Sequence, residues 1–327
     1  MQEKHWLGVI LGSYFVLGLI YATVTPIFEA SDELWHYPMV RHLADGNPLP
    51  VQGADYVGPW KQQASQPPLY YYVAAGLTWW IDTSDMETVR YQNPHVDNGV
   101  ITADGNINLV VHDREGSTWQ GTLLAVRIVR YFSVLLGLGT VYLTYLIGRM
   151  AAPRRPEVGL GGAAVTAFTP MFLFISGAVN NDNLVMVLAA LALWLMMRTV
   201  AEKRLEWKWL GLIGLISGAG ALAKFPALAL APMGLGTIFI ARWAASEKDV
   251  RIVSLGRLLG TSLRDWVIFL VPMGSVAGWW YWRNKQLYGD WLGWSAFFDV
   301  LGVRATPASL AQLWDERWGF MLSYWGL

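Results

Sequence analysis

Two neighbouring carboxylates, Asp32 and Glu33, follow closely after a long uncharged segment near the start of the chain. No residue from Trp6 to Val24 is charged, and this length is close to the roughly 20 residues that a helix needs to cross a bilayer. A carboxylate held at that place could act as a general base at the membrane surface. Acids are also common at helix starts, where their charge complements the helix dipole. The pair therefore predicts either surface chemistry or a stabilised helix end.

His36 lies one helical turn beyond Asp32, so its ring could hydrogen-bond the carboxylate, contact a phosphate or complete a metal site. The spacing does not match a zinc protease helix, because that motif needs two His ligands with a Glu between them and Asp32 occupies the first ligand position. His112 and Asp113 could add ligands from later in the same loop. The sequence does not decide whether the protein binds a metal ion, for instance a divalent one.

The composition indicates an integral membrane protein, because 54% of the residues are hydrophobic and only 15% are charged. The net charge is zero, so no overall basic field attracts nucleic acid. The chain contains no Cys, which excludes disulfides, a thiolate nucleophile and a Cys-ligated metal. The first apolar segment has a weak basic start and no convincing cleavage site, so we interpret it as a retained anchor.

About seven apolar segments predict membrane spans, and the shorter ones need flanking Trp and Arg or neighbouring helices to cross. The fold class expected is an all-α polytopic membrane protein with a large outer loop that contains interfacial helices. The predicted spans run from Trp6 to Val24, Leu123 to Ile147, Leu160 to Val179, Leu184 to Val200, Trp209 to Ala223, Phe225 to Ala241 and Trp266 to Trp282.

Basic residues gather in three short loops between these spans, which the positive-inside rule places in the cytoplasm. The N-terminus is then cytoplasmic, and the acidic loop 26–122 faces the periplasm or the extracellular side of the cell membrane. The basic residues are Arg149, Arg154 and Arg155 in the first loop, Arg198, Lys203, Arg204 and Lys208 in the second, and Arg242, Lys248, Arg251, Arg257 and Arg264 in the third.

The first part of the outer loop predicts a helix from Asp32 to Asp45. Ser31 suits the N-cap, Gly46 suits the exit, and prolines at 48 and 50 prevent continuation. One face of this helix forms a stripe that could lie along the membrane interface. The stripe consists of Asp32, Trp35, His36, Met39, Val40 and Leu43.

Three weaker patterns complete the chain. The run from Val73 to Ile81, after two prolines and three tyrosines, predicts a second interfacial or re-entrant helix. Alternating apolar residues between Asn93 and Gly121 indicate a short hairpin. The segment from Pro307 to Tyr324 could form an amphipathic helix within an outer C-terminal segment, 283–327.

Taken in order, five sequence elements resemble the polytopic glycosyltransferases of the GT-C fold, especially bacterial relatives of protein mannosyltransferases and of the lipid A aminoarabinose transferase. The resemblance covers essentially the whole chain, 1–327, as a single membrane domain. Members usually continue with more spans, so we expect an incomplete member. The elements are Asp32-Glu33, Gln66-Pro-Pro-Leu-Tyr70, Asn180-Asn-Asp182, Leu222-Ala-Lys-Phe-Pro226 and Trp282-Arg-Asn-Lys-Gln-Leu-Tyr-Gly289.

The resemblance implies transfer of a sugar from a polyprenyl-phosphate carrier to a hydroxyl acceptor, with inversion at the anomeric carbon. It implies that Asp32 is the general base, while Glu33 orients the acceptor or Asp32. Some enzymes of this fold use a divalent metal and others do not. The partners implied are the lipid-linked donor, membrane lipids and an unidentified acceptor.

The donor phosphate needs cationic partners near the outer boundary, and Lys224 and Arg283 are favoured because they lie on that side against the general placement of positive charge. Arg127 and Arg130 are further candidates. For each of them, snorkelling towards the headgroups is an alternative role. The substrate-binding set implied is His36, Gln66, Tyr70, Asn180, Asp182, Lys224 and Arg283.

Two other classes remain open from the sequence. A transporter or lipid flippase would place ionisable groups within its spans, whereas the charges here accumulate in the outer loop and no internal repeat is clear. A catalytically silent scaffold or receptor is the third possibility. The short cytoplasmic loops lack a Gly-rich phosphate-binding pattern, which favours a lipid-linked donor over a nucleotide sugar.

Overall fold

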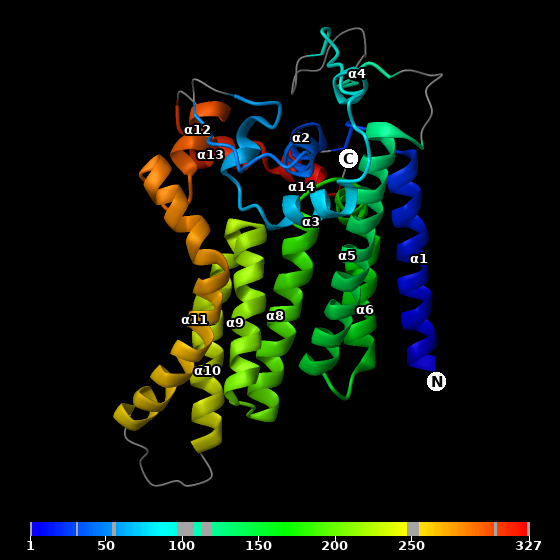
Figure 1. Ribbon diagram of the computed structural model, residues 1–327. Helices are drawn as coiled ribbons and strands as arrows, with labels where there is room; N and C mark the ends of the chain where they lie inside the picture. Colours follow the sequence, from blue (N-terminus) through cyan, green and yellow to red (C-terminus); the bar gives the residue numbers. More distant parts are fainter. Residues whose placement is uncertain are drawn as a thin grey trace.

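The computed structural model describes residues 2–30, 32–53, 57–96, 108–112, 119–246, 255–303 and 306–325. Within these ranges the chain is helical, and the one pairing of extended segments is an isolated bridge between Gln92 and Val110. Seven long helices run side by side as a bundle, and shorter helices gather at one end of it (Figure 1). The predicted all-α membrane fold is therefore confirmed.

All seven predicted spans are helical. By length and apolar character, four helices could cross a membrane, or five when a bent pair counts as one span. The chain is thus a multi-pass membrane protein. The bundle consists of α1 (Gln2–Val24), α5 (Gly121–Ala151), α6 (Pro156–Phe168), α8 (Asp182–Glu202), α9 (Trp207–Ala223), α10 (Leu230–Ser246) and α11 (Leu255–Tyr288).

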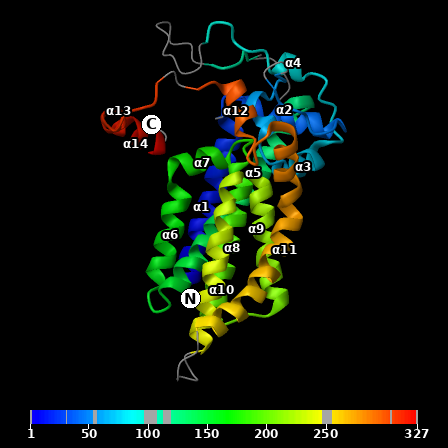
Figure 2. The ribbon, with the colours of Figure 1, turned by 90° about the vertical axis from the view of Figure 1, so that its left-hand side faces the viewer.

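The predicted span from Leu160 to Val179 is wrong as one straight helix. Helix α6 ends at Phe168, and α7 (Pro170–Ser176) leaves it at an angle of 64°. Pro170 lacks the backbone N–H that would continue the ladder, and it disfavours helical geometry at Thr169, whose backbone is extended. Helix α7 consequently turns across the end of the bundle (Figure 2).

Small residues allow the long helices to approach closely, as is common in membrane bundles. Helix α1 buries one face with a four-residue period, at Ile10, Tyr14, Gly18 and Ala22. A methyl group at Gly18 would lie 2.8 Å from Val134 on α5, so only glycine fits without a shift. These contacts set the position at which α1 ends and the loop begins.

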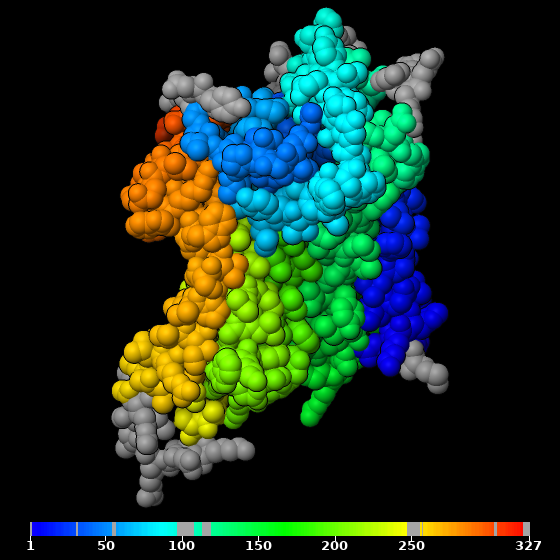
Figure 3. Space-filling view, in the orientation of Figure 1, coloured from blue at the N-terminus to red at the C-terminus, as the bar shows by residue number. Residues whose placement is uncertain are grey.

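The N-terminal end of α1, the first two predicted basic loops and the described ends of α10 and α11 lie at the same end of the bundle, here called the basic end (Figure 1). The opposite end, here called the loop end, carries the segment between α1 and α5. That segment forms a layer over the bundle (Figure 3). It contains α2 (Glu33–Ala44), the short 3-10 helix η1 (Lys61–Ser65), α3 (Leu69–Thr78) and α4 (Met86–Val89).

Helix α2 is buried within this layer, so the predicted stripe along the membrane interface is wrong. Trp35, Met39 and Val40 belong to the hydrophobic core. Pro38 lies inside the helix and leaves the carbonyl of Leu34 without its usual donor. The Arg90 Nε atom donates to that carbonyl at 3.0 Å, which repairs the break and ties α2 to the rest of the loop.

The remaining weak predictions have mixed outcomes. Helix α3 confirms a helix after Pro67 and Pro68, beginning a few residues earlier than expected. The hairpin between Asn93 and Gly121 lies largely outside the described residues, as do Ser31 and Asp113. The predicted helix from Pro307 to Tyr324 is divided into α13 (Leu310–Asp315) and α14 (Arg317–Trp325), and α12 (Trp294–Leu301) precedes them in the C-terminal segment.

Candidate functional site

Asp32 occupies an unusual backbone position at the start of α2. Its φ of 56° is left-handed, and its side chain makes no cap hydrogen bond to the helix. Such a conformation is costly for a residue other than glycine and persists only where the surroundings impose it. The residue is partly exposed, so its carboxylate remains accessible from outside the protein. Asp32 is therefore held in place without being used as a helix cap.

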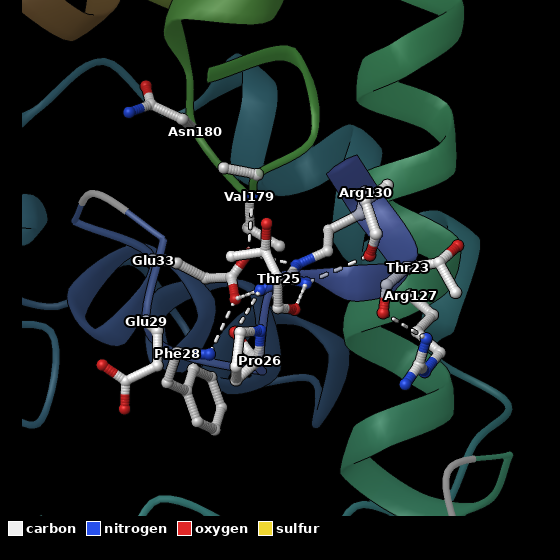
Figure 4. A network of polar contacts seen from close by, with 12 residues as sticks. Thr23, Thr25, Pro26, Phe28, Glu29, Glu33, Arg127, Arg130, Val179 and Asn180 are labelled. Atoms are coloured by element: carbon white, nitrogen blue, oxygen red, sulfur yellow. Dashed lines mark hydrogen bonds and ion pairs between the residues drawn. The ribbon is translucent and has the colours of Figure 1, made fainter. Parts of the chain in front are cut away.

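A buried ion pair holds this position. Both oxygens of Glu33 contact the Arg130 guanidinium of α5, at 2.8 and 2.6 Å, and both side chains have no exposed surface. The same carboxylate accepts the backbone N–H groups of Phe28 and Val179, each at 2.9 Å. Figure 4 shows how this network joins the end of α1, the start of α2 and the turn before α8.

Arg130 also completes the end of α1. Its Nη1 atom donates to the carbonyls of Ala22 and Thr25, and its Nη2 atom donates to that of Pro26. These carbonyls lie in and beyond the last turn of the helix, where helical partners are lacking and positive charge is favourable. Arg130 is thus fully used by the protein and is not free for a phosphate.

Glu33 was expected among the catalytic residues, and its geometry assigns it another role. The side chain is fully buried, and every contact of its carboxylate is with the protein. Because Glu33 is the next residue in the chain, its contacts fix the backbone beside Asp32. The buried carboxylate itself is not placed to contact a substrate. We therefore treat Glu33 as a positioning residue for Asp32.

Lys224 and Asp182 form an ion pair that interacts electrostatically with Asp32. Lys224 is extended between α9 and the 3-10 helix η2 (Phe225–Ala229), as the predicted break requires. Its Nζ atom lies 2.6 Å from Oδ1 of Asp182, in the first turn of α8. Both residues interact electrostatically with Asp32. Two of the predicted substrate-binding residues are thus brought together with the predicted base.

The environment raises the pKa of Asp32 above its ordinary value. Partial burial is the main cause, Lys224 opposes it, and the negative charge of Asp182 adds to it. A carboxylate with a raised pKa is a stronger proton acceptor than an ordinary one. This property suits a general base.

His36 and Tyr70 lie in buried polar contacts behind this group. The His36 Nδ1 atom is 2.8 Å from the Tyr71 hydroxyl, and burial, with a smaller contribution from Lys224, lowers the pKa of His36 to about 3. The Tyr70 hydroxyl accepts the backbone N–H of Asn180 at 3.0 Å and pairs with Ser133. Both residues are predicted to bind substrate; in the structure they are buried, and their polar contacts link parts of the layer to one another and to the bundle.

A cavity of about 370 Å³ opens at the loop end, and its lining is mainly apolar. Lys224 and Gln66 are the long polar side chains in this lining. Gln66 is oriented on both sides, because it donates to Gln63 at 2.6 Å and accepts from Asn181 at 2.7 Å. The lining consists of Ser65, Gln66, Pro67, Lys224, Phe225, Leu292, Trp294, Phe297 and Phe298.

Arg283 and Asn180 lie at the edges of this region. The Arg283 Nη2 atom donates to the carbonyl of Pro50 at 2.9 Å, which fastens α11 to the loop. Asn180 is buried and accepts the backbone N–H of Asp182 at 2.9 Å, so it shapes the turn that presents Asp182. Neither residue lines the cavity.

A metal centre does not emerge from the part of the chain that the structure describes. Within those residues, no three His, Asp or Glu side chains gather in a way that could hold an ion. His112 instead lies 2.8 Å from Glu29. That pair orders the loop, because Glu29 also accepts the backbone N–H groups of Leu109 and Val110.

Comparison with known proteins finds a family model that matches part of the chain. The model of the family described as dolichyl-phosphate-mannose-protein mannosyltransferase matches residues 124–263, from α5 into α11. No curated protein sequence matches the chain. Among solved structures, the chain is similar to one in the structure of the S. cerevisiae protein O-mannosyltransferase Pmt1-Pmt2 complex bound to the sugar donor, with 16% identity and a TM-score of 0.59.

That similarity covers 88% of this chain and 34% of the yeast chain, so this chain spans about a third of the length of its structural relative. The order of the helices, the helical bundle and the layer at its loop end together define this chain as a polytopic membrane protein. Its fold is that of the GT-C glycosyltransferases, which confirms the class that the sequence resembles.

Proposed function

We propose that this protein is a glycosyltransferase that moves a sugar from a polyprenyl-phosphate carrier to a hydroxyl acceptor at the outer face of the cell membrane. The observation that carries the proposal is the grouping of exposed Asp32 with Lys224, which lines the apolar cavity. A base, a cation for a phosphate and an apolar space for a lipid chain then lie at one end of the bundle. The fold and the family match support the same reaction class.

The reaction would be a single displacement. Asp32 takes the proton from the acceptor hydroxyl, whose oxygen forms a bond to the anomeric carbon from the side opposite the phosphate. The bond between the anomeric carbon and the phosphate oxygen breaks at the same time, and the carrier phosphate leaves with its negative charge near Lys224. Attack from the opposite side inverts the anomeric configuration.

The cavity suits the carrier better than a free sugar nucleotide. Phe225, Leu292 and Phe297 give it apolar walls, which isoprenoid units would contact favourably. Lys224 supplies the compact positive charge that a phosphate requires. Because the matching family is described by dolichyl-phosphate-mannose, a mannose carried by a polyprenyl phosphate is the first donor to test.

The test uses the purified protein in nanodiscs with a panel of polyprenyl-phosphate sugars and soluble hydroxyl acceptors. We expect one donor to yield free polyprenyl phosphate and a glycoside of inverted configuration, identified by mass spectrometry and NMR. The same donors in liposomes separate the transporter class. Movement of intact donor across the bilayer without cleavage would contradict the proposal.

A further inference from the structure

The loop end of α11 carries three buried hydrogen-bond donors that have no partner among the described residues. They are Nε1 of Trp280, Nη1 of Arg283 and Nδ2 of Asn284. Their spacing of i, i+3 and i+4 places the three residues on one face of the helix. Leaving a buried polar group unpaired is costly, and nearly all such groups in folded proteins have partners. This face therefore indicates a site that something else completes.

Asn284 is the centre of this group. It is fully buried, and its acceptor atom Oδ1 also lacks a partner within the described chain. A methyl group added at Gly293 would lie 3.2 Å from Asn284 Nδ2 and 3.5 Å from the carbonyl oxygen of Ser65. Ser65 and both neighbours of Gly293 line the cavity. The Asn284 amide thus lies directly behind that wall, at the place where the wall has no side chain.

The segment that forms this wall is firmly held. Asp290 accepts the backbone N–H groups of Leu292, Trp294 and Ser295, at 2.9, 3.0 and 3.1 Å. Gln52 links the first part of the loop to α12, because its Nε2 atom donates to the carbonyl of Ala296 at 2.8 Å. These hydrogen bonds consequently fix the position of the cavity wall next to Asn284.

The donor and acceptor pattern distinguishes between ligands. An ionised phosphate only accepts hydrogen bonds, so it would leave Asn284 Oδ1 unpaired. A hydroxyl group donates and accepts, and a pair of neighbouring hydroxyls can satisfy both atoms of one amide. The Trp280 indole and the Arg283 guanidinium add donors for further oxygens. The set fits a hydroxyl-rich ligand.

We propose that Asn284, assisted by Trp280 and Arg283, recognises the hydroxyl groups of the sugar carried by the lipid-linked donor. This inference rests on the proposed function. In it, two groups of residues bind different parts of the lipid-linked donor. Lys224 serves the phosphate, and the α11 face reads the sugar. Asn284 is then a specificity-determining residue.

The decisive variant is Asn284→Leu, which keeps a similar volume and removes both amide atoms. Binding is measured in nanodiscs by native mass spectrometry for a polyprenyl-phosphate sugar and for polyprenyl phosphate without sugar. We expect the native protein to bind the sugar-bearing form more tightly. The variant should lose at least about tenfold in affinity for that form, or about 1.4 kcal/mol, because the hydrogen bonds of both amide atoms are removed, and it should keep its affinity for the bare carrier.

Three further measurements give the result a single meaning. Trp280→Phe removes the indole N–H together with part of the ring system, and should weaken binding of the sugar-bearing form alone, so it replaces Asn284→Leu if that variant fails to fold. Lys224→Met should weaken both forms. Ser217→Ala, in the middle of α9, removes another buried unpartnered oxygen and should change neither affinity.

Thermal unfolding without ligand provides an independent readout. Asn284→Leu should unfold at a higher temperature than the native protein, because two unpaired buried atoms are removed. Equal loss of affinity for both carriers, or an unchanged affinity for the sugar-bearing form, would overturn the assignment and leave ordered water as the partner of Asn284. If the native protein binds neither carrier, the proposed function itself fails and the sugar assignment falls with it.

Discussion

At the scale of single residues, Asp32 combines an exposed carboxylate with a constrained backbone. Two charged residues act on it in opposite directions, since Lys224 lowers its pKa and Asp182 raises it. These opposite effects allow the role of Asp32 as a base to be tested through pH dependence without changing Asp32 itself.

Activity should rise with pH as Asp32 loses its proton, with a midpoint above that of an ordinary aspartate. In Asp182→Asn the midpoint should move to lower pH, because a negative neighbour that raises the Asp32 pKa is gone. In Lys224→Met it should move to higher pH. The measurement is the pH profile of kcat/KM, and shifts in the same direction in both variants would contradict the assignment.

His36 makes a second prediction, which concerns stability. Its pKa of about 3 in the folded protein lies below the ordinary value of 6.5, so between these values the unfolded chain binds more protons than the folded one. Stability contributed by neutral His36 is therefore lost as pH falls from 6.5 towards 3. The unfolding temperature of the native protein should drop in this range more steeply than that of His36→Gln.

A glutamine at position 36 can still pair with the Tyr71 hydroxyl but does not titrate. Parallel pH dependence of the native protein and the variant would show that His36 is not the group responsible. Activity profiles offer a further check, since a buried neutral His36 should give no inflection near pH 6.5.

Some of this residue-scale picture could be predicted from the sequence. Asp32 was found from its position after an uncharged span, and Lys224 from its place between two apolar runs. The partners of Glu33 could not be found in this way. Arg130 is 97 residues away in the chain, and sequence periodicity contains no signal for contacts at that distance. Asn284 lies within the predicted element Trp282–Gly289, but a lone asparagine gives no signal for the role that we propose for it.

At the scale of elements, the Glu33–Arg130 pair fixes the start of α2 relative to α1, α5 and α8. Removing one member of a buried ion pair typically costs about 3–5 kcal/mol. Arg130→Met should therefore lower the free energy of unfolding by about that amount. It should also reduce turnover, because Asp32 loses its support.

Arg127 offers a matched control one turn earlier on α5. Its contacts are weak, with an Nη1 atom 3.4 Å from the carbonyl of Thr23 and the guanidinium over the Trp119 ring. Arg127→Met should cost about 1 kcal/mol, in line with a single hydrogen bond. Equal destabilisation in the two variants, measured by chemical unfolding in detergent, would contradict the special role of Arg130.

Element positions were predictable where a local signal existed. Gly46 and the following prolines marked the end of α2, and the Lys224-Phe-Pro segment marked the break after α9. Pro170 carried the signal for the bend before α7, but the apolar run on both sides concealed it. The burial of α2 was not predictable, because a stripe of apolar residues looks the same whether protein or lipid covers it.

At the scale of the whole molecule, the basic loops within the described residues lie at one end of the bundle and the candidate site lies at the other (Figure 1). The positive-inside rule then predicts that the site faces away from the cytoplasm. The chain contains no Cys, so single cysteines can be introduced without removing any. Val57, at the loop end, and Arg154, at the basic end, are both exposed.

In intact cells, a membrane-impermeant thiol reagent should label Val57→Cys and should leave Arg154→Cys unlabelled. Permeabilisation should make both accessible. The reverse labelling pattern in intact cells would place the site on the cytoplasmic side. It would contradict the proposal that transfer occurs at the outer face of the membrane.

The most direct test of the central claim compares sugar transfer by the native protein with transfer by Asp32→Asn, after the active donor is known. Asp45→Asn, at the other end of α2, serves as the control. The account predicts that Asp32→Asn retains donor binding and fold but loses about 10²–10⁴ in turnover, the range typical of a general base, while Asp45→Asn stays active. Turnover in Asp32→Asn equal to that of the native protein would contradict it.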